Sequence, residues 1–135
     1  MKTKQIMKKI ILYHYSDKDF KNFINPSYYG HNYFTHNDCQ ITTIKRAFYY
    51  TDPKRAEYLL QGSKYLYITE IKSKDIYNIT EDKQGYLKRC NGDIDLALRK
   101  IKRNYRGVIY NVGYDIVNLF NRAKIKDCKT LTKAF

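Results

Sequence analysis

Clustered and alternating apolar positions predict three strands in the first half of the chain. Residues 10–15 form a short β-branched and aromatic run, which is typical of a buried strand. An aromatic run over 47–51 and an alternating run over 65–71 predict two more strands, and 75–79 predicts a short extended piece. Residues 27–44 are polar and aromatic with little periodicity, so we expect an irregular segment there.

Two helices are predicted, one in each half of the chain. Thr51 and Asp52 precede Pro53, which is typical of a capped helix start, and this helix is expected to run to about residue 60. Asp93 caps a second, amphipathic helix with basic residues on its outer side. Its apolar stripe is formed by Ile94, Leu98, Ile101 and Tyr105.

The last third of the chain predicts a hairpin and a weaker strand. Residues 108–110 and 116–120 are expected to be strands joined by a turn at Gly113. Residues 124–126 are expected to pair at a sheet edge, where lysines oppose unwanted strand addition. The tail over 127–135 is expected to be loose.

This order of elements predicts an α+β fold rather than a regular array of alternating strands and helices. Residues 81–91 are expected to be a loop between the middle strands and the second helix. We expect one domain over 1–135, with a core over about 10–126 that needs neither disulfide nor metal at this size.

Composition adds a strong positive charge and many tyrosines. The formal net charge is +13, with 15 Tyr, 6 Phe and no Trp. Such a charge attracts nucleic acid, acidic proteins or a pyrophosphate, although it also serves solubility. Three scattered cysteines favour a reducing compartment, and no apolar run is long enough for a membrane span. We therefore expect the protein to act in the cytoplasm, either of its own cell or of a host cell.

Chemistry-bearing residues occur at three places. His14 stands near the end of the first strand and is followed by Ser16; an imidazole in a core strand needs partners for its ring nitrogens. Tyr49 and Thr51 end the second strand just before a helix start, where free backbone N–H groups lie. An acid follows later, either Asp82 or Asp115, and the residues alone leave this choice open.

In this order, these motifs resemble the ADP-ribosyltransferase superfamily, in its diphtheria-toxin/PARP-like branch with a His-Tyr-acid triad. The resemblance covers about residues 10–125 and extends to phage and plasmid polyvalent-protein domains, rifampin ADP-ribosyltransferases and an anti-CRISPR ADP-ribosyltransferase. The motifs that carry it are Tyr13-His14-Tyr15-Ser16, Tyr49-Tyr50-Thr51 and the late Asp82 or Asp115. The resemblance implies a split β-sandwich of two small antiparallel sheets with flanking helices.

The resemblance also implies roles around NAD as a substrate. His14 would bond ribose hydroxyls, with Tyr15 and Ser16 beside it, and Tyr49 would stack on the nicotinamide ring. Thr51 would support that pocket. The acid, with Asp115 slightly favoured over Asp82, would stabilise the cationic ribose as nicotinamide leaves.

Arg46 completes the expected site, since its guanidinium could meet the pyrophosphate of NAD. The implied enzyme is an NAD-dependent glycosyltransferase that modifies a macromolecular acceptor, an acidic protein or a nucleic-acid-associated complex. The small size and the resemblance to mobile-element proteins point to a phage or mobile-element anti-defence protein, or a toxin.

Features of the sequence also bear on two other classes of function. The charge and the tyrosines also suit a basic nucleic-acid-binding or decoy protein without catalysis. His31, His36 and Cys39 are ligand types that zinc prefers, but their spacing matches no strong motif and a fourth ligand is missing, so we expect no metal.

Overall fold

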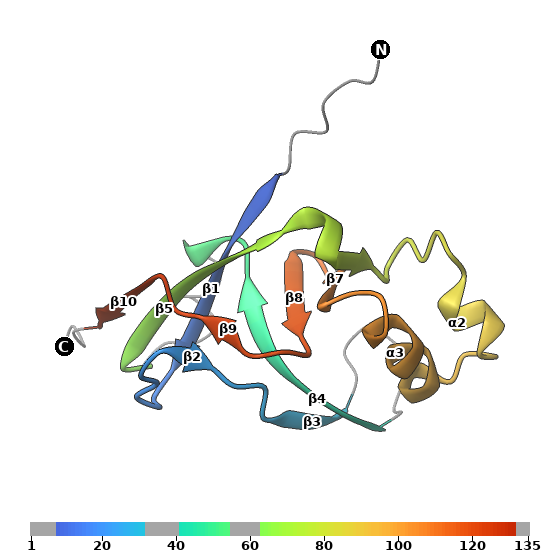
Figure 1. The fold of residues 1–135 in the computed structure, drawn as a ribbon, viewed down its shortest axis with the longest axis horizontal. Helices are drawn as coiled ribbons and strands as arrows, with labels where there is room; N and C mark the ends of the chain where they lie inside the picture. Colours follow the sequence, from blue (N-terminus) through green and yellow to red (C-terminus); the bar gives the residue numbers. More distant parts are fainter. Residues whose placement is uncertain (1–7, 32–40, 55–62, 132–135) are drawn as a thin grey trace, which may run out of the picture.

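A computed structural model of the chain describes residues 8–31, 41–54 and 63–131. It confirms the predicted α+β class: strands dominate, and the described residues include two α-helices and one 3₁₀ helix (Figure 1). The elements in chain order are β1 (Lys9–Ser16), β2 (Phe23–Ile24), β3 (Tyr28–His31), β4 (Ile41–Tyr50), β5 (Tyr65–Lys72), η1 (Ser73–Asp75), β6 (Ile76–Asn78), α2 (Tyr86–Arg89), α3 (Ile94–Lys102), β7 (Gly107–Asn111), β8 (Asp115–Leu119), β9 (Ala123–Lys124) and β10 (Asp127–Thr130).

Eight strands form one mixed sheet in the order β10-β5-β1-β4-β8-β7-β6, with β3 paired to β4 outside this path. Strands β6 and β7 are parallel, and the crossover between them contains α2 and α3. β1 pairs with β5 along its whole length but aligns with β4 at one pair, Tyr13 with Tyr50. The strands therefore form one large sheet with a narrow junction, instead of the two separate antiparallel sheets that were expected.

Helix α3 covers one face of the sheet. The Asp93 side chain accepts a hydrogen bond from Leu96 N, which caps the helix as predicted. Three members of the predicted stripe, Ile94, Leu98 and Ile101, are buried in one cluster with side chains of β7 and β8. The helical spacing of apolar residues thus predicted both the helix and the side that packs.

The opposite face of the sheet is covered by a small two-stranded ribbon, formed by β2 and β9. Phe23 aligns with Lys124, and Ile24 aligns with Ala123. Ile24 and Ala123 are buried in a cluster with Leu12 of β1. The ribbon thus bridges the narrow junction between β1 and β4 and closes a second core there.

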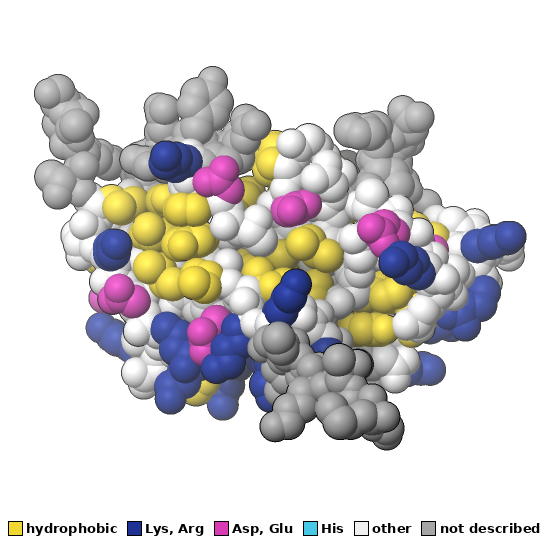
Figure 2. Space-filling model, turned by 90° about the horizontal axis from the view of Figure 1, so that it is seen from above, with side chains coloured by type: hydrophobic (Ala, Val, Ile, Leu, Met, Phe, Trp, Pro, Cys, Tyr) yellow, Lys and Arg dark blue, Asp and Glu magenta, His cyan; other side chains and the backbone are white. Residues whose placement is uncertain are grey.

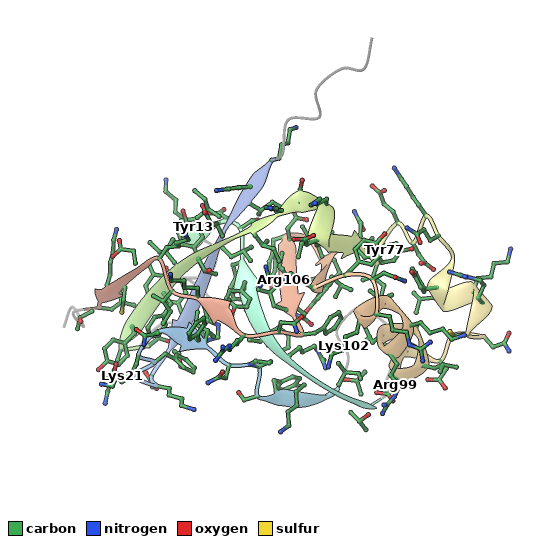
Figure 3. The ribbon with its side chains drawn as sticks, in the orientation of Figure 1. Tyr13, Lys21, Tyr77, Arg99, Lys102 and Arg106 are labelled. Carbon is green, nitrogen blue, oxygen red and sulfur yellow. The ribbon has the colours of Figure 1, made fainter. Side chains whose placement is uncertain are left out.

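A different apolar surface lies above the sheet. Figure 2 shows hydrophobic side chains gathered over the end of the molecule that holds β1, β5 and β10, and Figure 3 places Tyr13 on this upper side. Tyr15 and Leu66 are buried in that cluster, with Tyr13 and Tyr50 packed against them. Alternation along β1 therefore sends Tyr13 and Tyr15 to the upper face and His14 to the ribbon face.

One charged side chain is fully enclosed in the sheet. Arg46 on β4 has 0% of its surface exposed. Its guanidinium donates hydrogen bonds to Asn118 Oδ1 at 2.8 Å and to Thr42 Oγ1 at 2.5 Å, and it stacks over the rings of Tyr28 and Phe48. These contacts replace the water that a buried guanidinium loses.

Two predictions about the middle and end of the chain are corrected, and one is made more specific. Residues 81–91, expected to be a loop, contain α2, because the Asp82 carboxylate accepts hydrogen bonds from the first N–H groups of that short helix. Residues 124–126 were expected to pair at a sheet edge; Lys124 does so, in the two-stranded ribbon, where it aligns with Phe23. The supposed loose tail from Asp127 forms β10, since its backbone pairs with β5 although its side chains are exposed.

The early part of the chain differs as well. Residues 27–44 were expected to be irregular, but β3 and the start of β4 lie within them, and 32–40 lie outside the described residues. Pro53 and Lys54 are helical, as predicted, and the rest of that helix also lies outside the described residues. No helix among the described residues is long and apolar enough to cross a membrane.

Removing the amide that holds Arg46 should destabilise the fold. We expect Asn118→Ala to lower the free energy of unfolding by about 2–3 kcal/mol, because a buried guanidinium loses a hydrogen-bond acceptor. The measurement is urea unfolding, with the exposed Asn121→Ala as the matched control. Equal midpoints for the two variants would contradict this account of Arg46.

Candidate functional site

Four aromatic side chains meet beneath the ribbon, beside the junction of β1 and β4. We call His14, Phe20, Tyr49 and Tyr67 the aromatic cluster. The ring centroid of His14 lies 5.2 Å from that of Tyr49, 6.0 Å from that of Phe20 and 6.4 Å from that of Tyr67. The two residues expected to share a site, His14 and Tyr49, are therefore neighbours on one face.

The hydrogen bond of His14 determines which of its ring nitrogens is open. Nδ1 lies 2.6 Å from the backbone oxygen of Phe48 on β4. A carbonyl only accepts, so Nδ1 carries the proton. Burial lowers the pKa of His14, against a smaller opposite effect of this hydrogen bond, so the imidazole is neutral at pH 7. Its Nε2 then presents a lone pair that can accept a hydrogen bond from a ligand hydroxyl.

Tyr49 is fully enclosed, and its hydroxyl is not satisfied. The side chain has 0% exposure, and its hydroxyl has no hydrogen-bond partner within the described part of the chain. Burial raises the pKa of Tyr49, and the positive charge of Arg106 acts weakly in the opposite direction. A buried hydroxyl without a partner is costly, so it marks a place where a polar ligand atom would be favourable.

Asp115 lies on the same sheet face as Tyr49. Alternation along β8 groups Asp115 with Val117 and Leu119, which are buried in the cluster that contains Tyr49, and Val117 is directly opposite Tyr49. The carboxylate is exposed and accepts a hydrogen bond from Asn111 Nδ2 at 3.0 Å. An exposed carboxylate at the rim of this face is available to a ligand.

Asp82 is engaged elsewhere. Its two carboxylate oxygens accept hydrogen bonds from Tyr86 N at 2.9 Å and Leu87 N at 3.0 Å, and Oδ1 also accepts one from the Tyr77 hydroxyl. Burial and this carboxylate raise the pKa of Tyr77 to about 12. Through these bonds Asp82 stabilises the start of α2, away from the aromatic cluster.

Two residues expected to contact NAD do not lie on this face. Arg46 is three positions before Tyr49, so strand alternation puts it on the opposite side, where it is buried against Asn118. Tyr15 adjoins His14 and also points to the opposite side; its hydroxyl donates to Pro53 O at 3.1 Å. The pyrophosphate role predicted for Arg46 therefore has no support from its position.

The remaining expected residues are at the border of the site. Ser16 ends β1, and its Oγ accepts a hydrogen bond from Lys18 N at 3.0 Å, which shapes the turn after the strand. Thr51 is half-buried at the bend that follows β4, two residues after Tyr49. Neither side chain is buried on the opposite face of the sheet, so both stay next to the aromatic cluster.

Phe20 and Tyr67 also belong to the aromatic cluster, although no sequence motif singles them out. Tyr67 aligns with His14 across β1 and β5, and its hydroxyl donates to Lys18 O at 2.7 Å and accepts from Phe20 N at 2.8 Å. These bonds hold the chain after β1 against the cluster. The alternation over 65–71 predicts that Tyr67 points to one face of the sheet. Its position beside His14 follows only from the register between β1 and β5.

The region of the rejected metal site lies mostly outside the described residues, since His36 and Cys39 fall within 32–40. Among the residues that the structure does describe, no group of three or more His, Cys, Asp or Glu side chains could hold a metal ion.

The chain matches no protein-family model, no curated protein and no solved structure.

The lowered pKa of His14 should make stability depend on pH. Unfolding exposes the imidazole, which then binds a proton below about pH 6.5, so the contribution of His14 is present above that pH and is lost as the pH falls toward the lowered folded value. We expect wild type to lose more stability than His14→Asn between about pH 7 and about pH 5 in urea unfolding. Asparagine is chosen because it keeps an amide donor near Phe48 O. Parallel pH profiles for the two proteins would contradict a lowered pKa of His14.

The unsatisfied hydroxyl of Tyr49 should cost stability. We expect Tyr49→Phe to raise the free energy of unfolding by about 1 kcal/mol, because a buried polar group without a partner is removed. Tyr110→Phe is the control, since the Tyr110 hydroxyl accepts a hydrogen bond from Asn118 on the opposite face, and it should lose stability. A loss of similar size in both variants would show that Tyr49 has a partner.

Proposed function

We propose that this protein is an NAD-dependent ADP-ribosyltransferase of the diphtheria-toxin/PARP-like kind. The single observation that carries the proposal is the pairing of a neutral His14 and an unsatisfied Tyr49, 5.2 Å apart by ring centroid on one face of the sheet. Both are among the residues to which the resemblance gives a role around NAD. Asp115 on the same face supplies the acid of a His-Tyr-acid set.

The arrangement of the sheet supports this proposal. A site between two sheets needs a place where neighbouring strands separate, and β1 and β4 align at a single pair, Tyr13 with Tyr50. His14 and Tyr49 come directly after and before those two residues. We therefore infer that this junction corresponds to the split of the ADP-ribosyltransferase-like sandwich.

The chemistry open to the three side chains fits the reaction. The Nε2 lone pair of His14 would accept a hydrogen bond from a ribose hydroxyl, and the Tyr49 ring would hold the nicotinamide. When the bond between ribose C1′ and the nicotinamide nitrogen breaks, positive charge develops on the sugar, and the Asp115 carboxylate would stabilise it. An acceptor oxygen or nitrogen then bonds to C1′, and the acceptor's proton is released.

The site must open for NAD to bind. Tyr49 has 0% exposure, and Ile24 and Ala123 of the ribbon are buried in its cluster. The ribbon is held by two aligned residue pairs and by a hydrogen bond from Ile125 N to Asn22 O at 2.9 Å. Displacing this small element, while the large sheet keeps its pairing, would expose the Tyr49 ring.

The full burial of Tyr49 also favours a second candidate, a basic binding or decoy protein without catalysis. In that case the aromatic cluster is a core, the hydroxyl of Tyr49 is an uncompensated cost, and His14 serves to tie β1 to β4. The two candidates differ in one measurable product, which is nicotinamide released from NAD.

The choice between Asp115 and Asp82 tests the proposed enzyme. We expect Asp115→Asn to lower nicotinamide release by roughly 10²–10³-fold with unchanged unfolding, because a charge that stabilises the transition state is removed. Asp82→Asn is the matched control: it should lower stability through loss of the α2 cap and keep most of the activity. The readouts are nicotinamide release, label transfer from NAD and urea unfolding.

Several outcomes would reject the assignment. Wild type that releases no nicotinamide and transfers no label, with host lysate as the source of acceptor, favours the binding candidate. Full activity of Asp115→Asn with loss in Asp82→Asn, at equal stability, would place the acid at α2 instead.

A further inference from the structure

The outer surface of the ribbon combines an aromatic ring with positive charges. Alternation along β2 and β9 buries Ile24 and Ala123 and turns Phe23 and Lys124 outward. The guanidinium of Arg122 lies over the Phe23 ring, 4.2 Å from its centroid. Three outward side chains thus form a compact basic and aromatic surface above the aromatic cluster.

Two more cations extend this surface toward α3. The backbone of Arg106 is fixed on both sides, since its N–H donates to Asp75 O at 2.8 Å and its oxygen accepts from Phe120 N at 2.9 Å. Phe120 leads into the segment that carries Arg122. In Figure 3 Arg106 is labelled over β8, in the middle of the molecule, and Lys102 is labelled below it, toward α3. We call Lys102, Arg106, Arg122 and Lys124 the basic strip.

The members of the basic strip are not neutralised. All four are exposed, and none takes part in an ion pair among the residues that the structure describes. Neighbouring cations such as Arg99 and Lys126 differ, because they are paired with Asp95 and Glu70. Unpaired cations in a row repel one another, so they favour a bound polyanion.

We propose that the basic strip binds the phosphate backbone of a single-stranded nucleic acid, with Phe23 as a stacking surface for a base. This binding would name the class of acceptor for the proposed enzyme, and the acceptor assignment therefore rests on the proposed function. The strip borders the ribbon that covers His14 and Tyr49, so a bound strand lies next to the site. The positive charge of Arg106 opposes the rise in the pKa of Tyr49 that burial causes.

The aromatic ring favours nucleic acid over an acidic protein. Both partners would meet the cations, but a flat ring beside guanidinium groups is the arrangement on which bases stack, and stacking is worth about 1–3 kcal/mol per base. A single strand exposes its bases for this contact, whereas a duplex keeps them paired. The short length of the strip, with four cations, suits a few nucleotides.

The test is fluorescence anisotropy of a fluorescein-labelled oligothymidine of about 12 nucleotides, without NAD. Four phosphate contacts at about 0.7 each predict a slope of log affinity against log salt near −3. Arg106→Ala with Arg122→Ala should weaken binding roughly 10–100-fold and make the slope shallower by about 1.4. Phe23→Ala should weaken binding with little change of slope, because it removes stacking and no charge.

The matched control removes the same charge elsewhere. Lys74→Ala with Lys88→Ala changes two exposed lysines of η1 and α2, and it should leave affinity and slope close to wild type. Equal weakening by both pairs, absence of binding at low salt, or equally strong competition by polyglutamate would overturn the proposal; the last result would indicate an acidic protein partner. Because NAD is absent, failure here is separate from failure of nicotinamide release.

Discussion

The hydrogen bond from His14 Nδ1 to Phe48 O is the interaction on which the rest of the site depends. It joins β1 to β4 next to Tyr13 and Tyr50, the one residue pair at which these strands align. The His14 side chain therefore adds a link between two strands that share few backbone contacts. The same bond selects the tautomer of the imidazole and leaves Nε2 open. One proton, on Nδ1, thus both supports the junction and leaves Nε2 as a hydrogen-bond acceptor.

The fold was predictable wherever apolar periodicity was strong. The stripe of α3 and the alternation of β5 gave the element and its buried side, because each pattern reflects local geometry. Helix α2 was missed because it has four residues and depends on the Asp82 carboxylate, and β10 was missed because all its side chains are exposed and only its backbone pairs. The role of β9 in the ribbon depends on a partner about a hundred residues away in sequence.

The sequence motifs proposed two members of the aromatic cluster, His14 and Tyr49, but not the sheet faces on which the expected residues lie. Strand alternation already separates Arg46 from Tyr49, three positions apart, and so the expected pyrophosphate contact was inconsistent with the sequence itself. The common face of His14 and Tyr49, on different strands, required the register between them. The different positions of Asp82 and Asp115 likewise depend on tertiary contacts: one carboxylate caps α2 and the other stays exposed on the Tyr49 face.

The ribbon of β2 and β9 has a consequence for affinity. Any molecule that reaches the Tyr49 ring competes with Ile24 and Ala123, which are the protein's own occupants of that place. Apparent affinity is then the intrinsic affinity multiplied by the fraction of molecules with the ribbon displaced. Because two residue pairs close the ribbon, a substitution at Ile24 or Ala123 would change the fraction of molecules in which the Tyr49 ring is exposed.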